Sequence, residues 1–92
     1  MYLEIVSPEA TLFAGEVNSV TVPGVDGEFQ MLNNHAAIVS LLQSGNVKFD
    51  GDFTIEEEYE DKFSKDDKGK TVLSISSGTV EMNNNKVIVL AD

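Results

Sequence analysis

The only histidine of this chain, His35, lies in the stretch GEFQMLNNHAAIV, which runs from Gly27 to Val39. An imidazole serves proteins as a general base, a metal ligand or a contact to a partner. A serine hydrolase needs a nucleophile beside such a base, and an oxyanion hole in the same cleft. No Gly-x-Ser-x-Gly motif supplies that nucleophile here. The polar NNH sequence predicts a turn in which His35 faces solvent or a partner.

The sequence offers few residues that could bind a metal ion. The chain has no cysteine, which excludes thiolate catalysis and Cys-based zinc sites, and its single histidine excludes a multi-His site. The sequence DGDFT does place Asp50, Asp52 and Thr54 like the first, third and fifth positions of a calcium loop. However, Ile55 stands where that loop needs glycine, and Asp61 stands where it needs glutamate.

Two further patterns favour a structural interpretation over a chemical one. A run of acids on one segment is typical of a solvated face rather than of a catalytic carboxylate pair, and this run comprises Glu56, Glu57, Glu58 and Glu60. The sequence PGVDG lacks the Gly-Lys-Ser/Thr ending of a phosphate-binding loop. We expect Gly24 and Gly27 to adopt positive φ in a tight turn between strands at 16–22 and 28–31.

Composition narrows the class of protein. Ninety-two residues make one domain with a thin core, and 16 acids against 6 lysines give a net charge of −10. That charge repels phosphates, so we expect no binding to nucleic acid. No apolar run is long enough to cross a bilayer. The start MYLEIV has no basic residues and no long apolar run, which predicts a protein of the cytosolic side without a secretory signal.

Most of the chain alternates between apolar and polar residues with the period of a half-buried strand. This pattern predicts strands over residues 2–6, 16–22, 28–31, 46–49, 71–76, 79–82 and 86–90. Turn signals separate them, among them SPEA, FAGE, QSG, SSG and NNN. The stretch HAAIVSLLQSG fits a helix or a strand equally well. Many short strands at this spacing predict an all-β sandwich or small barrel.

Residues 50–70 differ in character, with nine acids and four lysines. A sparse apolar stripe runs through them: Phe53, Ile55, Tyr59 and Phe63. We interpret this segment as an acidic, solvated hairpin inserted between two strands. Its tip, near residues 61–70, is expected to be mobile because it has little to bury.

Four motifs, in order, cover nearly the whole chain outside 50–70: LEIVSPEATLFAGEVNSVTVPGVDGEF (3–29), NNHAAIVSLLQSGNVKF (33–49), LSISSGTVEM (73–82) and VIVLAD (87–92). Their order and spacing resemble the N-terminal β-sandwich domain of the epsilon subunit of F-type ATP synthases. The resemblance implies one domain over residues 1–92, a flattened sandwich of about ten short strands, with HAAIVSLL as a strand.

The resemblance also implies a function. Subunits of this family sit at the foot of the rotating central stalk, one copy per complex. They bind the gamma subunit along one side and the polar loops of the membrane c-ring at one end, and they couple ion translocation to ATP synthesis. They perform no chemistry and need no cofactor. The implied location is peripheral, on the cytoplasmic face of the bacterial plasma membrane.

Site residues follow from the matching motif positions. In the family the c-ring contact involves the loop after the G-x-x-G turn and the histidine of H-A-P, which on this chain are Asp26, Gly27, Glu28 and His35. A c subunit loop typically carries a basic residue, to which Glu28 offers a carboxylate. Two serines lie near positions that face the gamma side of the stalk in the family: Ser7 and Ser40.

The sequence departs from the family pattern in several places. Ala37 replaces the proline of H-A-P, and Ser77 replaces the first glycine of S-G-G. Residues 50–70 are longer than the usual hairpin. Family members continue into a two-helix hairpin that in many bacteria inhibits hydrolysis, whereas this sequence ends at Asp92. A rival hypothesis is a free-standing acidic sandwich that binds calcium or a small ligand through residues 50–70.

Overall fold

The computed structural model describes residues 1–92, which form ten β-strands and one short 3₁₀ helix, η1 (Glu57–Lys62). The strands are β1 (Tyr2–Val6), β2 (Thr11–Glu16), β3 (Ser19–Gly24), β4 (Gly27–Leu32), β5 (Ile38–Leu42), β6 (Gly45–Asp50), β7 (Phe63–Lys65), β8 (Thr71–Ile75), β9 (Gly78–Asn83) and β10 (Lys86–Ala91). The prediction of an all-β chain with about ten short strands is confirmed.

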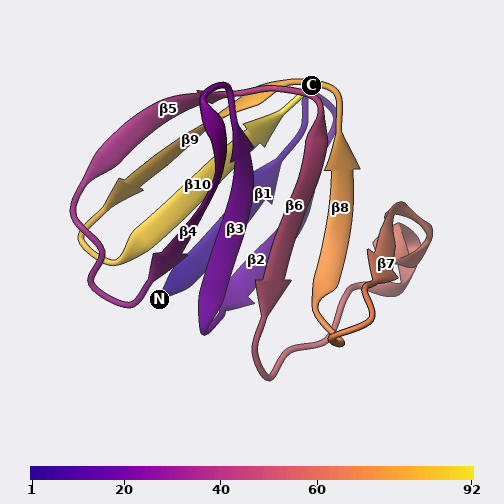
Figure 1. Ribbon diagram of the computed structural model, residues 1–92. Coiled ribbons are helices and arrows are strands. Elements are labelled where there is room, and N and C mark those ends of the chain that lie inside the picture. The colour runs from indigo at the N-terminus through magenta and orange to yellow at the C-terminus, as the bar shows by residue number, and fades with distance from the viewer.

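The strands form one curled sheet that folds into two layers (Figure 1). The first layer has the order β2-β1-β10-β9-β5, and the second has the order β4-β3-β6-β8-β7. A single pair, Gly24 with Leu42, joins the layers where β3 meets β5. All strand pairs are antiparallel except β1 with β10. This arrangement is the predicted flattened sandwich.

Inward-facing side chains from both layers make the core. The pairs predicted from the alternation are buried on five strands: Leu3 and Ile5, Val20 and Val22, Val47 and Phe49, Leu73 and Ile75, Val80 and Met82. The positions between them are more exposed on β1, β6 and β9, whereas β3 is buried throughout and β8 leaves only Ser74 exposed. Paired strands place such residues opposite one another, as Val20 opposes both Met31 and Phe49. Period-two patterning therefore identified the core correctly on these strands.

Strand β2 corrects the interpretation of FAGE as a turn. The chain pairs with β1 from Thr11 to Glu16, and it leaves the sheet only at residues 17–18, inside the predicted strand 16–22. Consecutive Leu12 and Phe13 are both buried, beside a register shift at Ile5/Val6, so β2 lacks a clean two-residue period. Such irregularities hide a strand from periodicity.

Residues 50–70 are not the solvated hairpin that we expected. They contain η1 and β7, which lie beside β8 in Figure 1. Four apolar side chains of the segment pack partly buried against the core: Phe53, Ile55, Tyr59 and Phe63. The ring centroid of Phe53 lies 4.9 Å from that of Phe13 on β2 and 5.3 Å from that of Phe49 on β6. The segment therefore packs its apolar side chains against the core, while its charged and small polar side chains face solvent.

Candidate functional site

The connection from β3 to β4 is a two-residue turn, Val25 and Asp26, because Gly24 pairs with Gly27. Gly27 has φ of 126°, which confirms the predicted positive φ there. Gly24 is required for a different reason. A Cβ atom at Gly24 would lie 2.8 Å from both the carbonyl oxygen of Gly27 and the ring of Phe29. The predicted positive φ at Gly24 is wrong, since this position needs space rather than a special backbone angle.

The same turn presents two free carboxylates. Asp26 and Glu28 are exposed, and the one ion pair of the chain joins other groups, the Met1 amino group and Glu16. Val25, at the tip, is half exposed. Unpaired carboxylates on a tight turn are available to a cationic partner without first breaking a contact within the chain.

His35 lies beyond the far end of β4, in a turn that begins with Asn33 and Asn34. Its imidazole is exposed, as predicted for a histidine in a polar turn. Nδ1 donates to the carbonyl oxygen of Ala36 over 2.7 Å, which leaves Nε2 as the free acceptor of the neutral ring. The backbone N–H of His35 donates to Leu32 over 3.1 Å. The strand predicted for HAAIVSLL is shorter than expected, because β5 begins only at Ile38 and leaves residues 35–37 outside it.

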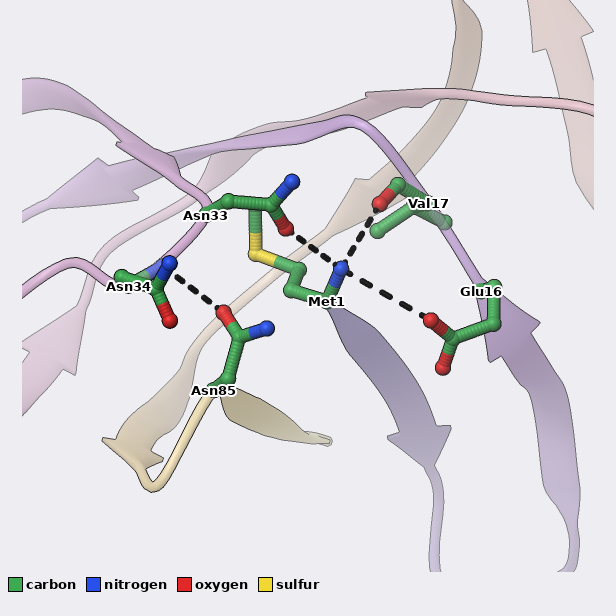
Figure 2. A network of polar contacts seen from close by, with 6 residues as sticks. All are labelled: Met1, Glu16, Val17, Asn33, Asn34 and Asn85. Atoms are coloured by element: carbon green, nitrogen blue, oxygen red, sulfur yellow. Dashed lines mark hydrogen bonds and ion pairs between the residues drawn. The ribbon is translucent and has the colours of Figure 1, made fainter.

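Polar contacts from three segments hold this turn in place (Figure 2). The Met1 amino group donates to Oδ1 of Asn33 over 2.6 Å and to the carbonyl oxygen of Val17 over 3.2 Å. The backbone N–H of Asn34 donates to Oδ1 of Asn85, in the turn between β9 and β10, over 2.8 Å. Figure 2 shows Asn33 and Asn34 tied to Met1, which precedes β1, and to Asn85, which precedes β10.

The structure separates residues that the sequence had grouped at one end. Gly27 begins β4 and Leu32 ends it, and an extended strand of this length spans about 17 Å. Asp26 and Glu28 therefore lie at one end of the sandwich, and His35 lies at the opposite end. The structure does not bring these residues together, because all of β4 lies between them, and their contact with a partner stays a prediction.

The two serines also lie apart. Ser7 ends β1, and its hydroxyl donates to the carbonyl oxygen of Ala10 over 3.2 Å and accepts from the N–H of Ala10 over 3.3 Å. Ser40 is in the middle of β5, half-buried opposite Val80. Its hydroxyl donates to the carbonyl oxygen of Leu41 over 3.3 Å. Both hydroxyls are thus engaged with the backbone near them.

An exposed apolar surface, which the sequence reasoning missed, covers the outer side of the first layer. Val39 is 75% exposed, Leu41 is 63% exposed and Leu90 is 52% exposed. Half-buried Val6 and Ile88 join them. We call these five residues the first-layer face. Two adjacent rows of paired residues cross four strands here, and the five aliphatic side chains share them with one hydroxyl and two carboxylates: Leu41, Thr79, Leu90 and Val6 in one row, and Val39, Glu81, Ile88 and Glu4 in the other.

A sequence signal for this face did exist. Strand β10 reads VIVL over residues 87–90, and β5 reads IV and LL around Ser40. Each of these strands is apolar at outward as well as inward positions. Strands of this kind are typical of sheets covered on both faces. A contiguous exposed patch of large aliphatic side chains marks an interaction surface.

No catalytic or metal constellation accompanies these surfaces. Asp50, the first position of the calcium-like motif, accepts a hydrogen bond from the Ser19 hydroxyl. No group of three or more His, Asp or Glu side chains is placed to hold a metal ion. No helix has the length and hydropathy needed to cross a bilayer.

Comparison with known proteins gives a family. The model of the ATP synthase Delta/Epsilon chain beta-sandwich domain matches residues 1–92. The ATP synthase epsilon chain of Campylobacter concisus is 38% identical over 92 residues, and this chain spans 60% of its length. That of Chlorobaculum tepidum is 34% identical over 90 residues, which are 98% of this chain and 86% of the relative.

Solved structures share the fold. A chain in the central stalk/c-ring structure of the Tetrahymena thermophila mitochondrial ATP synthase superposes with a TM-score of 0.74 at 13% identity, over 98% of this chain and 61% of that one. A chain of the Euglena gracilis mitochondrial ATP synthase gives a TM-score of 0.71 at 22% identity, over 97% and 48%. Because the family model matches residues 1–92, this chain belongs to the ATP synthase delta/epsilon chain β-sandwich family.

Proposed function

We propose that this chain acts at the foot of the central stalk of a rotary F-type ATP synthase, as a non-catalytic subunit without a cofactor. It couples rotation of the c-ring to the gamma subunit, and so ion translocation to ATP synthesis. The observation that carries the proposal is the family match over residues 1–92. An exposed apolar face on a chain without a reaction centre supports a role in assembly.

The first-layer face is the surface that we assign to gamma. Its three most exposed members, Val39, Leu41 and Leu90, would bury large aliphatic side chains on docking. The two serines proposed from sequence border this face, since Ser7 follows Val6 and Ser40 lies between Val39 and Leu41. Their hydroxyls bond to the backbone, so we expect them to act as neighbours of the contact rather than as its main source of affinity.

The β3–β4 turn is the surface that we assign to the polar loops of the c-ring. Asp26 and Glu28 offer free carboxylates there, and Gly27 permits close approach because it has no side chain. A charge pair that is desolvated in an interface contributes more than an exposed one. His35 lies at the other end of β4, so we propose it as a separate partner contact on the stalk.

The location follows from these contacts. One copy per complex would be held peripherally, through gamma and the c-ring, on the cytoplasmic face of the bacterial plasma membrane. A free-standing module whose function is to bind calcium or a small ligand is not favoured, because the family match covers residues 1–92.

Binding to a gamma–c-ring subcomplex from the same organism tests this function. We expect the wild-type chain to bind, and Leu41→Asp to weaken binding more than tenfold, because a charge would enter an apolar contact. Leu32→Asp is the matched control, since Leu32 is 54% exposed but lies on β4, outside the first-layer face. Glu28→Lys tests the turn separately.

The outcomes distinguish the parts of the proposal. Loss with Leu41→Asp and retention with Leu32→Asp would support the first-layer face as the gamma contact. Equal effects of both variants would contradict that assignment. If the folded wild-type chain bound nothing, the coupling function itself would be wrong. Unchanged binding by Glu28→Lys would remove the β3–β4 turn from the c-ring contact.

A further inference from the structure

A second surface lies on the outer side of the second layer. A concavity of about 330 Å³ opens there between β4 and the turn that joins β7 to β8. Three of the six lysines of the chain line it: Lys48, Lys68 and Lys70. Glu28 and Asp66 also line it, so three basic residues and two acidic residues surround the concavity. This concavity, which we call the lysine groove, is locally cationic in a chain of net charge −10.

One of the two carboxylates is already used by the fold. Oδ1 of Asp66 accepts hydrogen bonds from the backbone N–H groups of Lys68 and Lys70, both over 2.9 Å. The bond from Lys70 is the main cause that lowers the pKa of Asp66, and the ammonium groups of Lys48 and Lys70 act in the same direction. Asp66 therefore shapes the turn that brings Lys68 and Lys70 toward Lys48.

The floor of the groove holds polar groups without partners. Thr21 on β3 is 9% exposed and lines the groove, and its hydroxyl takes part in none of the side-chain hydrogen bonds of the chain. Since no fully buried polar atom lacks a partner, this hydroxyl must be reachable from the groove. Lys48 pairs with Thr21 across the strands, and it forms no ion pair.

We propose that the lysine groove binds a phosphate group. A tetrahedral anion has several acceptor oxygens, which match the ammonium groups of Lys48, Lys68 and Lys70 together with the hydroxyl of Thr21. The negative charge on the rest of the chain excludes long polyanions, so the groove would accept a small ligand. The bound phosphate group is either free inorganic phosphate or the phosphate monoester of a small molecule.

Backbone amide spectra of the full chain test this proposal. Inorganic phosphate is titrated against sodium chloride at equal ionic strength. We expect saturable shifts at Thr21, Lys48 and residues 68–70 with phosphate only. Lys48→Gln should weaken binding about tenfold, because it removes a charge-assisted donor. Glu28→Gln should strengthen binding, because it removes a repelling carboxylate from the groove.

The control is Lys86→Gln, since Lys86 lies 5.4 Å from the ring centre of Tyr2 on the first layer, outside the groove. Its affinity for phosphate should equal that of the wild type. Glycerol 3-phosphate distinguishes the sources: equal or tighter binding indicates a monoester ligand, and weaker binding indicates free phosphate. Shifts that chloride reproduces, or an unchanged affinity in a folded Lys48→Gln chain, would overturn the proposal.

Discussion

The outer sides of the two layers use the same alternation but present different chemistry. In the first layer, Leu41 and Leu90 point outward from β5 and β10 and leave an apolar surface. In the second layer, the outward positions of β3 and β6 include Thr21 and Lys48, which line the lysine groove. The inward positions of all four strands are apolar or half-buried.

This difference shows that inward and outward side chains of one sandwich serve different purposes. Inward side chains supply the burial that holds the two layers together, and they are similar in both. Outward side chains contribute little to that burial, so they are free to differ. The first layer therefore suits a protein partner, and the second layer suits a small anion.

The largest effect is expected where both layers meet. Phe49→Ala removes a fully buried ring whose centroid lies 4.8 Å from that of Phe13 in the opposite layer. We expect a loss of about 3–5 kcal/mol in the free energy of unfolding, measured by urea denaturation. Tyr59→Ala, at the half-buried margin of the core, should cost less. Equal losses would contradict the view that the ring of Phe49 unites the layers.

A smaller effect, confined to the first layer, is expected from Gly78→Ala. A Cβ atom at Gly78 would lie 2.3 Å from the carbonyl oxygen of Leu90, which is backbone and has little freedom to move. We expect a loss of about 1–3 kcal/mol in the free energy of unfolding. Amide shifts should change along β9 and β10 and stay unchanged at Thr21 and Lys48. Changes of equal size in both layers would show that the two faces are not independent.

The anchored turn at the His35 end should respond less. Asn85 has φ of 60° and accepts a hydrogen bond from Asn34. Asn85→Ala should lower the free energy of unfolding by about 1–2 kcal/mol, because it loses this bond and strains the backbone. Asn85→Gly keeps the backbone conformation, so thermal unfolding should show a smaller loss for it. If glycine destabilised as much as alanine, the hydrogen bond alone would account for the effect.

The smallest effect concerns pH and the second layer. Because the pKa of Asp66 is lowered in the folded chain, its contribution to stability is present above its ordinary value of 3.8 and is lost as the pH falls through the folded value. Asp66→Asn should therefore lose less stability on acidification than the wild type does. The NMR resonance of the carboxyl group gives the pKa of Asp66, and melting temperatures at acid pH give the loss of stability in each variant. Identical acid profiles would exclude this role for Asp66.

Much of the fold was predictable from sequence because burial imposes a period of two. Leu3 and Ile5, or Val20 and Val22, reveal their strands directly. Strand β2 was not predictable in this way, because its buried Leu12 and Phe13 are consecutive. The packing of residues 50–70 was not predicted, for another reason. Its charge density suggested solvation, while its few aromatic side chains determine where it packs.

The candidate surfaces were less predictable, since they depend on distances that motifs do not contain. Asp26 and His35 are close in sequence, but β4 places them at opposite ends. The lysine groove joins Lys48 on β6 with the turn after β7, and only the pairing of both strands with β8 brings these together. The positive φ of Gly27 was predicted correctly because glycine is the residue that adopts this region most readily beside a tight turn.

The parallel pairing of β1 with β10 has a consequence for how the chain acquires its structure. Leu3 lies opposite Val87, so β1 must wait for the synthesis of β10 before it gains this partner. Contacts between residues so far apart in sequence slow folding, because the ordering entropy is lost before the pairing energy is gained. Until β10 is synthesised, β1 and β9 lack the strand that joins them, and the first-layer face is incomplete. Synthesis of β10 thus sets the earliest moment at which this face can form.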